Sequence, residues 1–278
     1  MSDHILNHHT AQMPDIDTQL TKAPRSVNYI WLCPRAKCTT HQDFATRLPL
    51  HYFDRIYKNA ALYPQEEFNL WLDFRQLKIT DRFFLDSHRY LFDRAGIHIR
   101  DLNEVSEYAV QHGFAPDTNI ALYARADYAR VLVLNHLLRD DPDQIAIYSD
   151  LDCEDVALYD TKLEDTLDRF GVACGRSGRS KVANGYIALY GEDGLNFMDN
   201  FLLDRTSEAF QKNNVNHYGA FMKALRKFRH THHDTATLSE FGAIELPPMR
   251  TLIPYDEDKY GEICPEGQAR VPSTLNYV

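Results

Sequence analysis

The 278-residue sequence lacks several features that mark well-known classes of protein. No apolar run approaches the roughly 18 residues that cross a bilayer, so no membrane-spanning helix is expected. The first residues show no basic region followed by an apolar one, so no secretory signal peptide is expected. Neither Gly-x-Gly-x-x-Gly nor Gly-x-x-x-x-Gly-Lys occurs, which leaves a dinucleotide-binding fold or a P-loop NTPase without support.

Cysteine and positive charge are also scarce. The five cysteines form no Cys-x-x-Cys pair, and an odd number in a chain of this size indicates free thiols in a reducing compartment. The formal net charge is −10, whereas proteins that read nucleic acid are usually basic. We therefore expect a cytoplasmic protein that does not bind nucleic acid.

Apolar runs of strand length alternate with amphipathic helices. This alternation favours an α/β fold with a parallel, Rossmann-like sheet. Residues 1–24 are polar and aperiodic and are expected to form a flexible arm, whereas residues 25–278 are expected to form one domain. The predicted strands cover residues 27–32, 68–73, 97–99, 145–148, 171–174 and 182–190. The predicted helices cover residues 43–63, 81–93, 121–138, 162–169, 194–203 and 207–228, with a loop at 175–181 and loops over the last fifty residues.

The stretch over residues 119–155 organises the chain. Its helix carries Asp127 and Arg130 three positions apart, so both lie on one helix face. After Pro142 ends the helical region, a short apolar strand leads directly into Asp150 and Asp152. Ligands of open α/β sheets bind at the carboxyl ends of strands. Two carboxylates at this spacing suit a hard divalent cation that also binds substrate phosphates.

Asp-x-Asp alone is weak, because it occurs four times and is usually a solvated acidic turn. Only the copy at Asp150 and Asp152 follows an apolar strand and has an Asp-x-x-Arg helix just upstream, so its context favours a metal–phosphate site. An acidic strand-end loop remains the alternative. The other copies are Asp15/Asp17, Asp141/Asp143 and Asp256/Asp258.

The helix ARADYARVLVL followed by IAIYSDLDCED resembles the core of GT-A glycosyltransferases that have a sugar-binding Asp-x-x-Arg helix and a DxD loop. That group includes the clostridial glucosyltransferase toxins, arginine-modifying effector enzymes of enteric bacteria and yeast-type initiating mannosyltransferases. The segments SVNYIWLCP and FNLWLDF resemble the first two strands of these proteins. The resemblance implies a GT-A nucleotide-sugar-binding fold with helical and C-terminal additions.

The resemblance also implies an activity, the transfer of a sugar from a nucleotide-sugar, most simply a UDP-sugar, to an acceptor with retention of configuration. Asp152 would bind Mn²⁺ or Mg²⁺ directly, and Asp150 would reach the metal through water or hold the ribose. Asp127 and Arg130 would bind the sugar hydroxyls and the diphosphate. The remaining roles implied are uracil stacking for Trp31, the acceptor border for Asn184, metal ligation for Ser273 and Asn276, and a uracil cover for Tyr277 in a C-terminal lid.

The acceptor stays open between a protein, a glycan and a small molecule. A bacterial effector that a secretion system delivers into a host cell, to modify a host protein, is one version of this reading. The alternatives are a polysaccharide or small-molecule glycosyltransferase, a nucleotide-sugar hydrolase that uses the same acidic loop, and a non-catalytic α/β interaction module. Only the module predicts no metal-dependent affinity for UDP.

Overall fold

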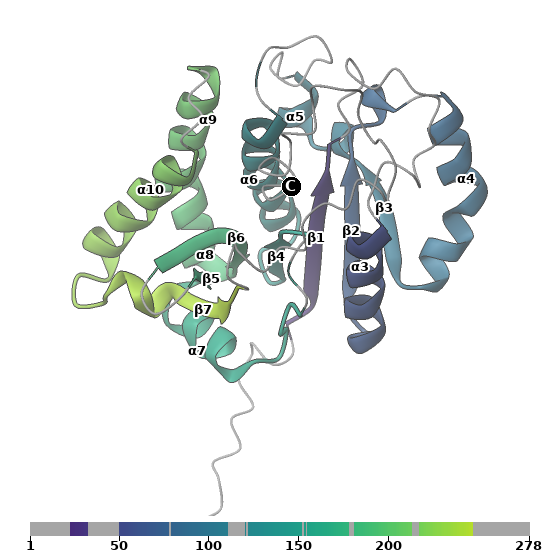
Figure 1. The fold of residues 1–278 in the computed structure, drawn as a ribbon. Helices are drawn as coiled ribbons and strands as arrows, with labels where there is room; N and C mark the ends of the chain where they lie inside the picture. The colour runs from purple at the N-terminus through teal and green to yellow at the C-terminus, as the bar shows by residue number, and fades with distance from the viewer. Residues whose placement is uncertain are drawn as a thin grey trace, which may run out of the picture.

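The computed structural model describes residues 23–32, 50–77, 79–110, 120, 122–151, 153, 155–177, 181–212 and 217–246. Within these ranges the chain forms a seven-stranded sheet with helices on both faces (Figure 1). The expected arm up to residue 22 lies outside the described residues, as do Asp152, Ser273, Asn276 and Tyr277. The strands are β1 (Arg25–Trp31), β2 (Glu67–Leu72), β3 (Ile97–Asp101), β4 (Ile145–Ser149), β5 (Val172–Ser177), β6 (Lys181–Leu189) and β7 (Gly242–Glu245). The α-helices are α3 (Leu50–Leu62), α4 (Ile79–Arg94), α5 (Ser106–Val110), α6 (Leu122–Asp140), α7 (Thr161–Phe170), α8 (Gly191–Phe197), α9 (Leu203–Gln211) and α10 (His217–His232).

Four parallel strands form one half of the sheet, in the order β3-β2-β1-β4. β1 is buried along its whole length, as expected of a strand that helices cover on both faces. Its internal amide is satisfied, because Trp71 Nε1 donates to Asn28 Oδ1 at 2.8 Å and Asn28 Nδ2 donates to the Ile147 carbonyl at 3.1 Å. The predicted parallel, Rossmann-like arrangement is confirmed for this half.

The other half of the sheet is mixed, which corrects the expectation of a parallel sheet. β6 runs antiparallel to both β4 and β5, and β7 runs parallel to β5. Short apolar runs look alike in sequence whichever direction they pair, so the pattern does not assign direction. The predicted loop at 175–181 is also corrected, because β5 continues to Ser177 and β6 begins at Lys181. β7 lies in the region that was expected to be loop, where Glu245 pairs with Arg176 at 3.1 Å.

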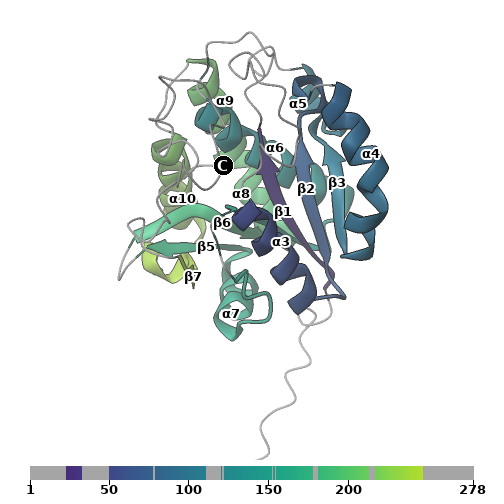
Figure 2. The same ribbon diagram turned by 45° about the vertical axis from the view of Figure 1, so that its right-hand side comes forward.

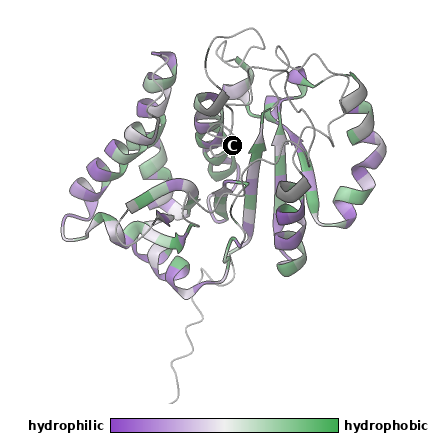
Figure 3. Cartoon of the chain, in the orientation of Figure 1, coloured by the Kyte–Doolittle hydropathy of each residue, from purple (hydrophilic) through white to green (hydrophobic). Residues whose placement is uncertain are grey.

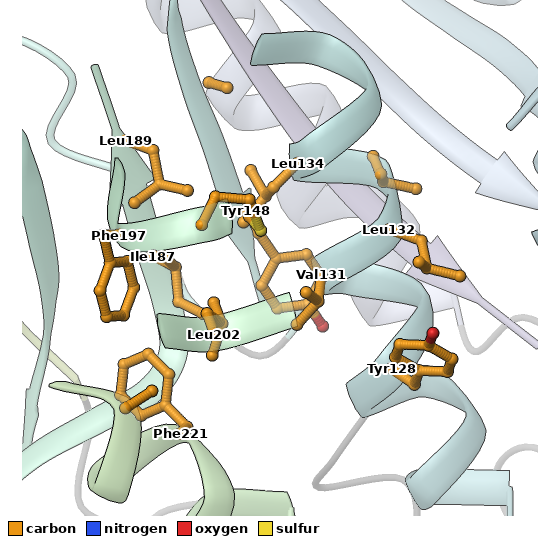
Figure 4. Close-up of a cluster of buried hydrophobic side chains, with 14 of the residues drawn as sticks. Tyr128, Val131, Leu132, Leu134, Tyr148, Ile187, Leu189, Phe197, Leu202 and Phe221 are labelled. Atoms are coloured by element: carbon orange, nitrogen blue, oxygen red, sulfur yellow. The ribbon is translucent and has the colours of Figure 1, made fainter. Parts of the chain in front are cut away.

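The sheet separates two apolar cores (Figure 2). α6 lies on one face and α3 on the other, and Figure 3 shows hydrophobic and hydrophilic residues mixed along the strands between them. α6 is buried on nearly all sides, because α8, α9 and α10 pack against the side of it that faces away from the sheet. Figure 4 shows Tyr148 of β4 among apolar side chains of α6, β6 and the helices that follow.

The helices after β6 differ from the predicted pair. The chain stays helical from Gly191 to Gln211, because the π-helix Met198–Leu202 joins α8 to α9, and α10 begins only at His217. A π-turn takes an extra residue and rotates the side chains that follow it, which hides the helical period in the sequence. Within the described ranges, no helix is both long enough and apolar enough to cross a membrane.

Candidate functional site

α6 and β4 bring three of the predicted site residues together at the carboxyl end of β4. Asp127 and Arg130 lie three residues apart on α6, and Arg130 Nη2 is 2.8 Å from Asp127 Oδ1. Asp150 directly follows β4, and its Oδ1 is 3.4 Å from the same Arg130 nitrogen. All three are buried, with exposed fractions of 7% for Asp127, 2% for Arg130 and 8% for Asp150.

Tyr148 of β4 also belongs to this cluster, two residues before Asp150. Its hydroxyl donates to Asp150 Oδ1 at 2.6 Å, and its ring lies under the Arg130 guanidinium, with 4.4 Å between the guanidinium carbon and the ring centroid. The contact combines a cation–π interaction with a hydrogen bond to a carboxylate. Sequence analysis treated Tyr148 as an ordinary buried strand residue, and its spacing two positions before Asp150 was the available signal.

A bulge in β6 supplies the other side of the site. Cys174 of β5 pairs with Ile187, but the next residue, Gly175, pairs with Ala183. Residues 184–186 therefore face no partner in the β5 ladder, which is how a bulge bends a strand and redirects its groups.

Two consecutive carbonyls in this bulge bind the site residues. The Asn184 carbonyl accepts from Arg130 Nη1 at 2.7 Å, and the Gly185 carbonyl accepts from the Asp150 backbone N–H at 2.7 Å. The Asn184 side chain also reaches Asp127 Oδ1 at 3.5 Å. The structure thus brings Asn184 to the cluster of Asp127, Arg130 and Asp150.

Burial controls the charge of the two carboxylates. Burial raises the pKa of Asp127 to about 6. The positive charge of Arg130 opposes this shift, and the negative charge of Asp150 adds to it. Burial also raises the pKa of Asp150, while Arg130 and the hydrogen bond from Tyr148 lower it. Among the described residues, Arg130 is the positive group that acts on both carboxylates. The cluster therefore favours a further positive charge.

This charge balance and the hard oxygen donors fit Mg²⁺ or Mn²⁺. In the part of the chain that the structure describes, however, no group of three or more His, Cys, Asp or Glu side chains is placed to hold a metal ion. The other predicted metal ligands, Asp152, Ser273 and Asn276, lie outside the described ranges. Tyr277, the predicted cover, lies outside them as well.

Trp31 lies apart from this cluster. It ends β1 within the core on the α3 face, whereas Tyr148 belongs to the core on the α6 face. Trp31 is 5% exposed, and within the described residues its Nε1 has no hydrogen-bond partner. The role of Trp31 in stacking on the base stays a prediction. That role requires one face of the Trp31 ring to become accessible to a ligand.

A second polar cluster, which the sequence analysis missed, follows β2. Asp73 accepts from Gln76 Nε2 at 2.6 Å, from the Tyr108 hydroxyl at 2.9 Å and from Arg75 Nε at 3.1 Å. Tyr108 also forms a side-chain hydrogen bond with Arg125 of α6, and burial lowers the pKa of Arg125. Asp73 thereby links the carboxyl end of β2 to the start of α6. The signal in the sequence was an acidic residue directly after a strand, the same position that Asp150 takes after β4.

A polar pocket of about 540 Å³ lies at the opposite edge of the parallel strands, where β1, β2 and β4 begin. Glu66, Glu67, Asp140 and Asp141 contribute its acidic groups, and Arg25 also lines it. The predicted site residues do not line this pocket. Its position at the amino ends of the strands separates it from the cluster around Arg130.

Comparison with known proteins gives fold similarity only. No family model and no curated protein sequence matches the chain. A solved structure titled PaToxG glycosyltransferase is 14% identical with a TM-score of 0.45, over 80% of this chain and 79% of that one. A transferase variant is 14% identical with a TM-score of 0.49, over 81% and 92%. The bacterial N-acetylglucosamine transferase NleB is 12% identical with a TM-score of 0.37, over 88% and 92%. Two of these titles name a sugar-transferring enzyme, and the third names only a transferase.

Proposed function

We propose that this protein is a metal-dependent glycosyltransferase that moves a sugar from a UDP-linked donor to an acceptor, with retention of configuration. The observation that carries the proposal is the buried cluster of Asp127, Arg130 and Asp150 at the carboxyl end of β4. Open α/β sheets bind their ligands at this edge. The fold by itself does not imply the activity, so the argument rests on the chemistry of these side chains.

Arg130 and Asp127 are proposed to bind the sugar and the diphosphate of the donor. A guanidinium presents donors in a fixed fork that matches phosphate oxygens, and Arg130 is already held from several sides, by Asp127, Asp150 and the Asn184 carbonyl. Such a held guanidinium needs little reorganisation when charge develops on the leaving diphosphate. Asp127 supplies carboxylate oxygens that accept hydrogen bonds from sugar hydroxyls.

Asp150 and Asp152 are proposed to hold Mn²⁺ or Mg²⁺. When bound, such an ion neutralises charge on the diphosphate leaving group. The hydrogen bond from Tyr148 fixes Oδ1 of the Asp150 carboxylate. Asp150 is therefore proposed to contact the metal through water or to hold the ribose. Asp152 is proposed as the direct ligand, with Ser273 and Asn276 completing the shell.

Leu246 supports the idea that the C-terminal segment serves the site. It is the last described residue, and its side chain lies beside Gly185, where a Cβ would be 3.4 Å from Leu246 Cδ1 and 2.5 Å from Asp150 Oδ2. Ser273 follows 27 residues later (273 − 246), and about 3.3 Å per residue gives ample chain to return to Asp150. We propose that Tyr277 then covers the base and that Trp31 stacks on it.

In the proposed reaction, an acceptor nucleophile bonds to the anomeric carbon as the bond from that carbon to the diphosphate oxygen breaks. The electron pair leaves with the diphosphate, where Arg130 stabilises it, and the acceptor proton passes to the leaving phosphate. The described residues contain no side chain that we assign as the acceptor base. Asn184 is proposed to border the acceptor, which remains open between a host protein, a glycan and a small molecule.

The test is a panel of nucleotide-sugars labelled in the sugar, incubated with the protein and Mn²⁺ and with lysate proteins, glycans or water as acceptors. We expect release of UDP from one UDP-sugar and transfer of label to an acceptor with the anomeric configuration kept. Labelled free sugar alone, with every acceptor tried, would favour a nucleotide-sugar hydrolase. No turnover and no binding of any nucleotide-sugar by the folded protein would contradict the proposal.

A further inference from the structure

Gly185 is unusual because the space that its side chain would take is already filled by a site residue. A Cβ on Gly185 would lie 2.5 Å from Asp150 Oδ2 and 3.3 Å from Asp150 Cγ. Gly185 does not have a left-handed φ, whereas Gly96, Gly171 and Gly191 do. The need for glycine at 185 is therefore one of space and not of backbone conformation.

Leu246 bounds the same space from the other side. Its Cδ1 would be 3.4 Å from a Cβ on Gly185 and 2.6 Å from a Cβ on Gly175. The Leu246 backbone N–H donates to the Arg176 carbonyl at 2.8 Å, so the side chain is anchored where β7 ends. Two glycines on neighbouring strands thus make room for Leu246 and for the Asp150 carboxylate.

Neighbouring groups constrain the Asp150 carboxylate and its backbone. Tyr148 and Arg130 bind Oδ1 at 2.6 Å and 3.4 Å, the Gly185 carbonyl binds the Asp150 backbone, and Oδ2 occupies the space above Gly185. Interiors are packed so closely that one added methyl group displaces its neighbours. A methyl group at 185 would rotate the carboxylate away from Tyr148.

We propose that Gly185 is a positioning residue of the site: it leaves the space that sets the orientation of the Asp150 carboxylate, and Leu246 closes that space. The proposal rests on the proposed function, because the orientation matters for activity only if Asp150 helps to bind the donor. The proposal predicts that the loss of stability caused by a side chain at position 185 depends on the Asp150 carboxylate and not on the surrounding backbone.

The first test is a double-mutant cycle read as melting temperature without metal. We expect Gly185→Ala to lower Tm by about 3 to 10 °C when Asp150 is present, the range expected for overpacking in a chain of this size. The same change in an Asp150→Ala background should lower Tm by less than a third as much. If Gly185→Ala alone fails to fold, folding of the double variant gives the same support.

The second test measures the site directly. Mn²⁺ titrated with electron paramagnetic resonance, in the presence of UDP, should bind Gly185→Ala at least about 10-fold more weakly, equivalent to about 1.4 kcal/mol. Gly242→Ala of β7 is the control, because its new Cβ would lie 3.2 Å from Arg176 Cβ and 3.3 Å from the Ser239 carbonyl, with neither Asp150 nor Leu246 among its nearest neighbours. Its Mn²⁺ affinity should stay within about 3-fold of wild type, since Asp150 is not displaced.

Three results would overturn the inference, and they differ from one another. Equal losses of Tm in the two backgrounds would show that the destabilisation by the new methyl group does not depend on the Asp150 carboxylate. Coupling in the cycle with unchanged Mn²⁺ affinity would show that the carboxylate orientation does not matter, while leaving the glycosyltransferase proposal intact. Wild-type protein that binds neither Mn²⁺ nor any nucleotide-sugar would remove the proposed function, and the positioning role with it.

Discussion

Replacing Asp127 by asparagine should make the protein more stable while abolishing its activity. Burial holds the pKa of Asp127 at about 6, against an ordinary value of 3.8. A carboxylate with a raised pKa binds more protons in the folded state than in the unfolded state, so the free energy of unfolding falls as the pH rises from about 4 to about 6. The rise of roughly two pKa units corresponds to about 3 kcal/mol, all of it lost above pH 6.

Asparagine keeps the shape of the side chain without the charge, and Arg130 retains Asp150 as a partner at 3.4 Å. Asp127→Asn should therefore match wild type near pH 4 and exceed it by up to about 3 kcal/mol at pH 7.5. Sugar transfer should be lost, because an amide replaces the carboxylate that is proposed to accept bonds from the sugar. Buried functional charges commonly carry such a stability cost.

The assay is urea denaturation, followed by circular dichroism in EDTA, at pH values from 4 to 7.5. Asp150 adds a slope of the same sign in both proteins, so the quantity to compare is the difference between wild type and variant. Asp143→Asn, in an exposed turn, controls for the change in net charge. A variant that is less stable than wild type at pH 7.5, or a difference that does not grow with pH, would refute the reasoning.

Other substitutions test neighbouring contacts. Arg130→Lys removes the fork that reaches the Asn184 carbonyl and both carboxylates, so kcat/KM for transfer should fall at least about 100-fold with the circular dichroism spectrum unchanged. Tyr148→Phe removes the 2.6 Å hydrogen bond to Asp150 and should lower the free energy of unfolding in urea by about 1 to 3 kcal/mol. Asn69→Leu should be neutral or stabilising in the same assay, because within the described residues its fully buried amide has no partner. A loss above about 1 kcal/mol for Asn69→Leu would show that a bound water satisfies the amide.

The parts of the fold and site that depend on local pattern were predictable. The helical period over 121–138 predicted α6, and the short apolar run before Asp150 predicted β4. The three-residue spacing of Asp127 and Arg130 placed both on one helix face, and the structure confirms that they meet each other and Asp150. These features follow from the 3.6-residue period of a helix and from the continuous apolar run of a buried strand.

The parts that depend on contacts between distant segments were not predictable. The reversal of β6, the bulge at 184–186 and the packing of Leu246 on Gly175 join residues that are far apart in the chain. The sequence does not mark Gly185 as a position that needs space, because only the folded arrangement shows that Asp150 fills the place of its side chain. The π-helix before α9 was missed because one inserted residue per turn hides the helical period.

The most direct test of the central claim compares two Asp-x-Asp pairs in the same chain. With Mn²⁺ and a UDP-sugar at about 100 times its Kd, mass action adds about 2.7 kcal/mol to the stability of the folded state, or roughly 5 °C or more in Tm. Wild type and the matched variant Asp141→Ala/Asp143→Ala should both show this metal-dependent rise, and Asp150→Ala/Asp152→Ala should show none. An equal rise in all three proteins, or no rise with any nucleotide-sugar, would contradict a metal–nucleotide site at the end of β4.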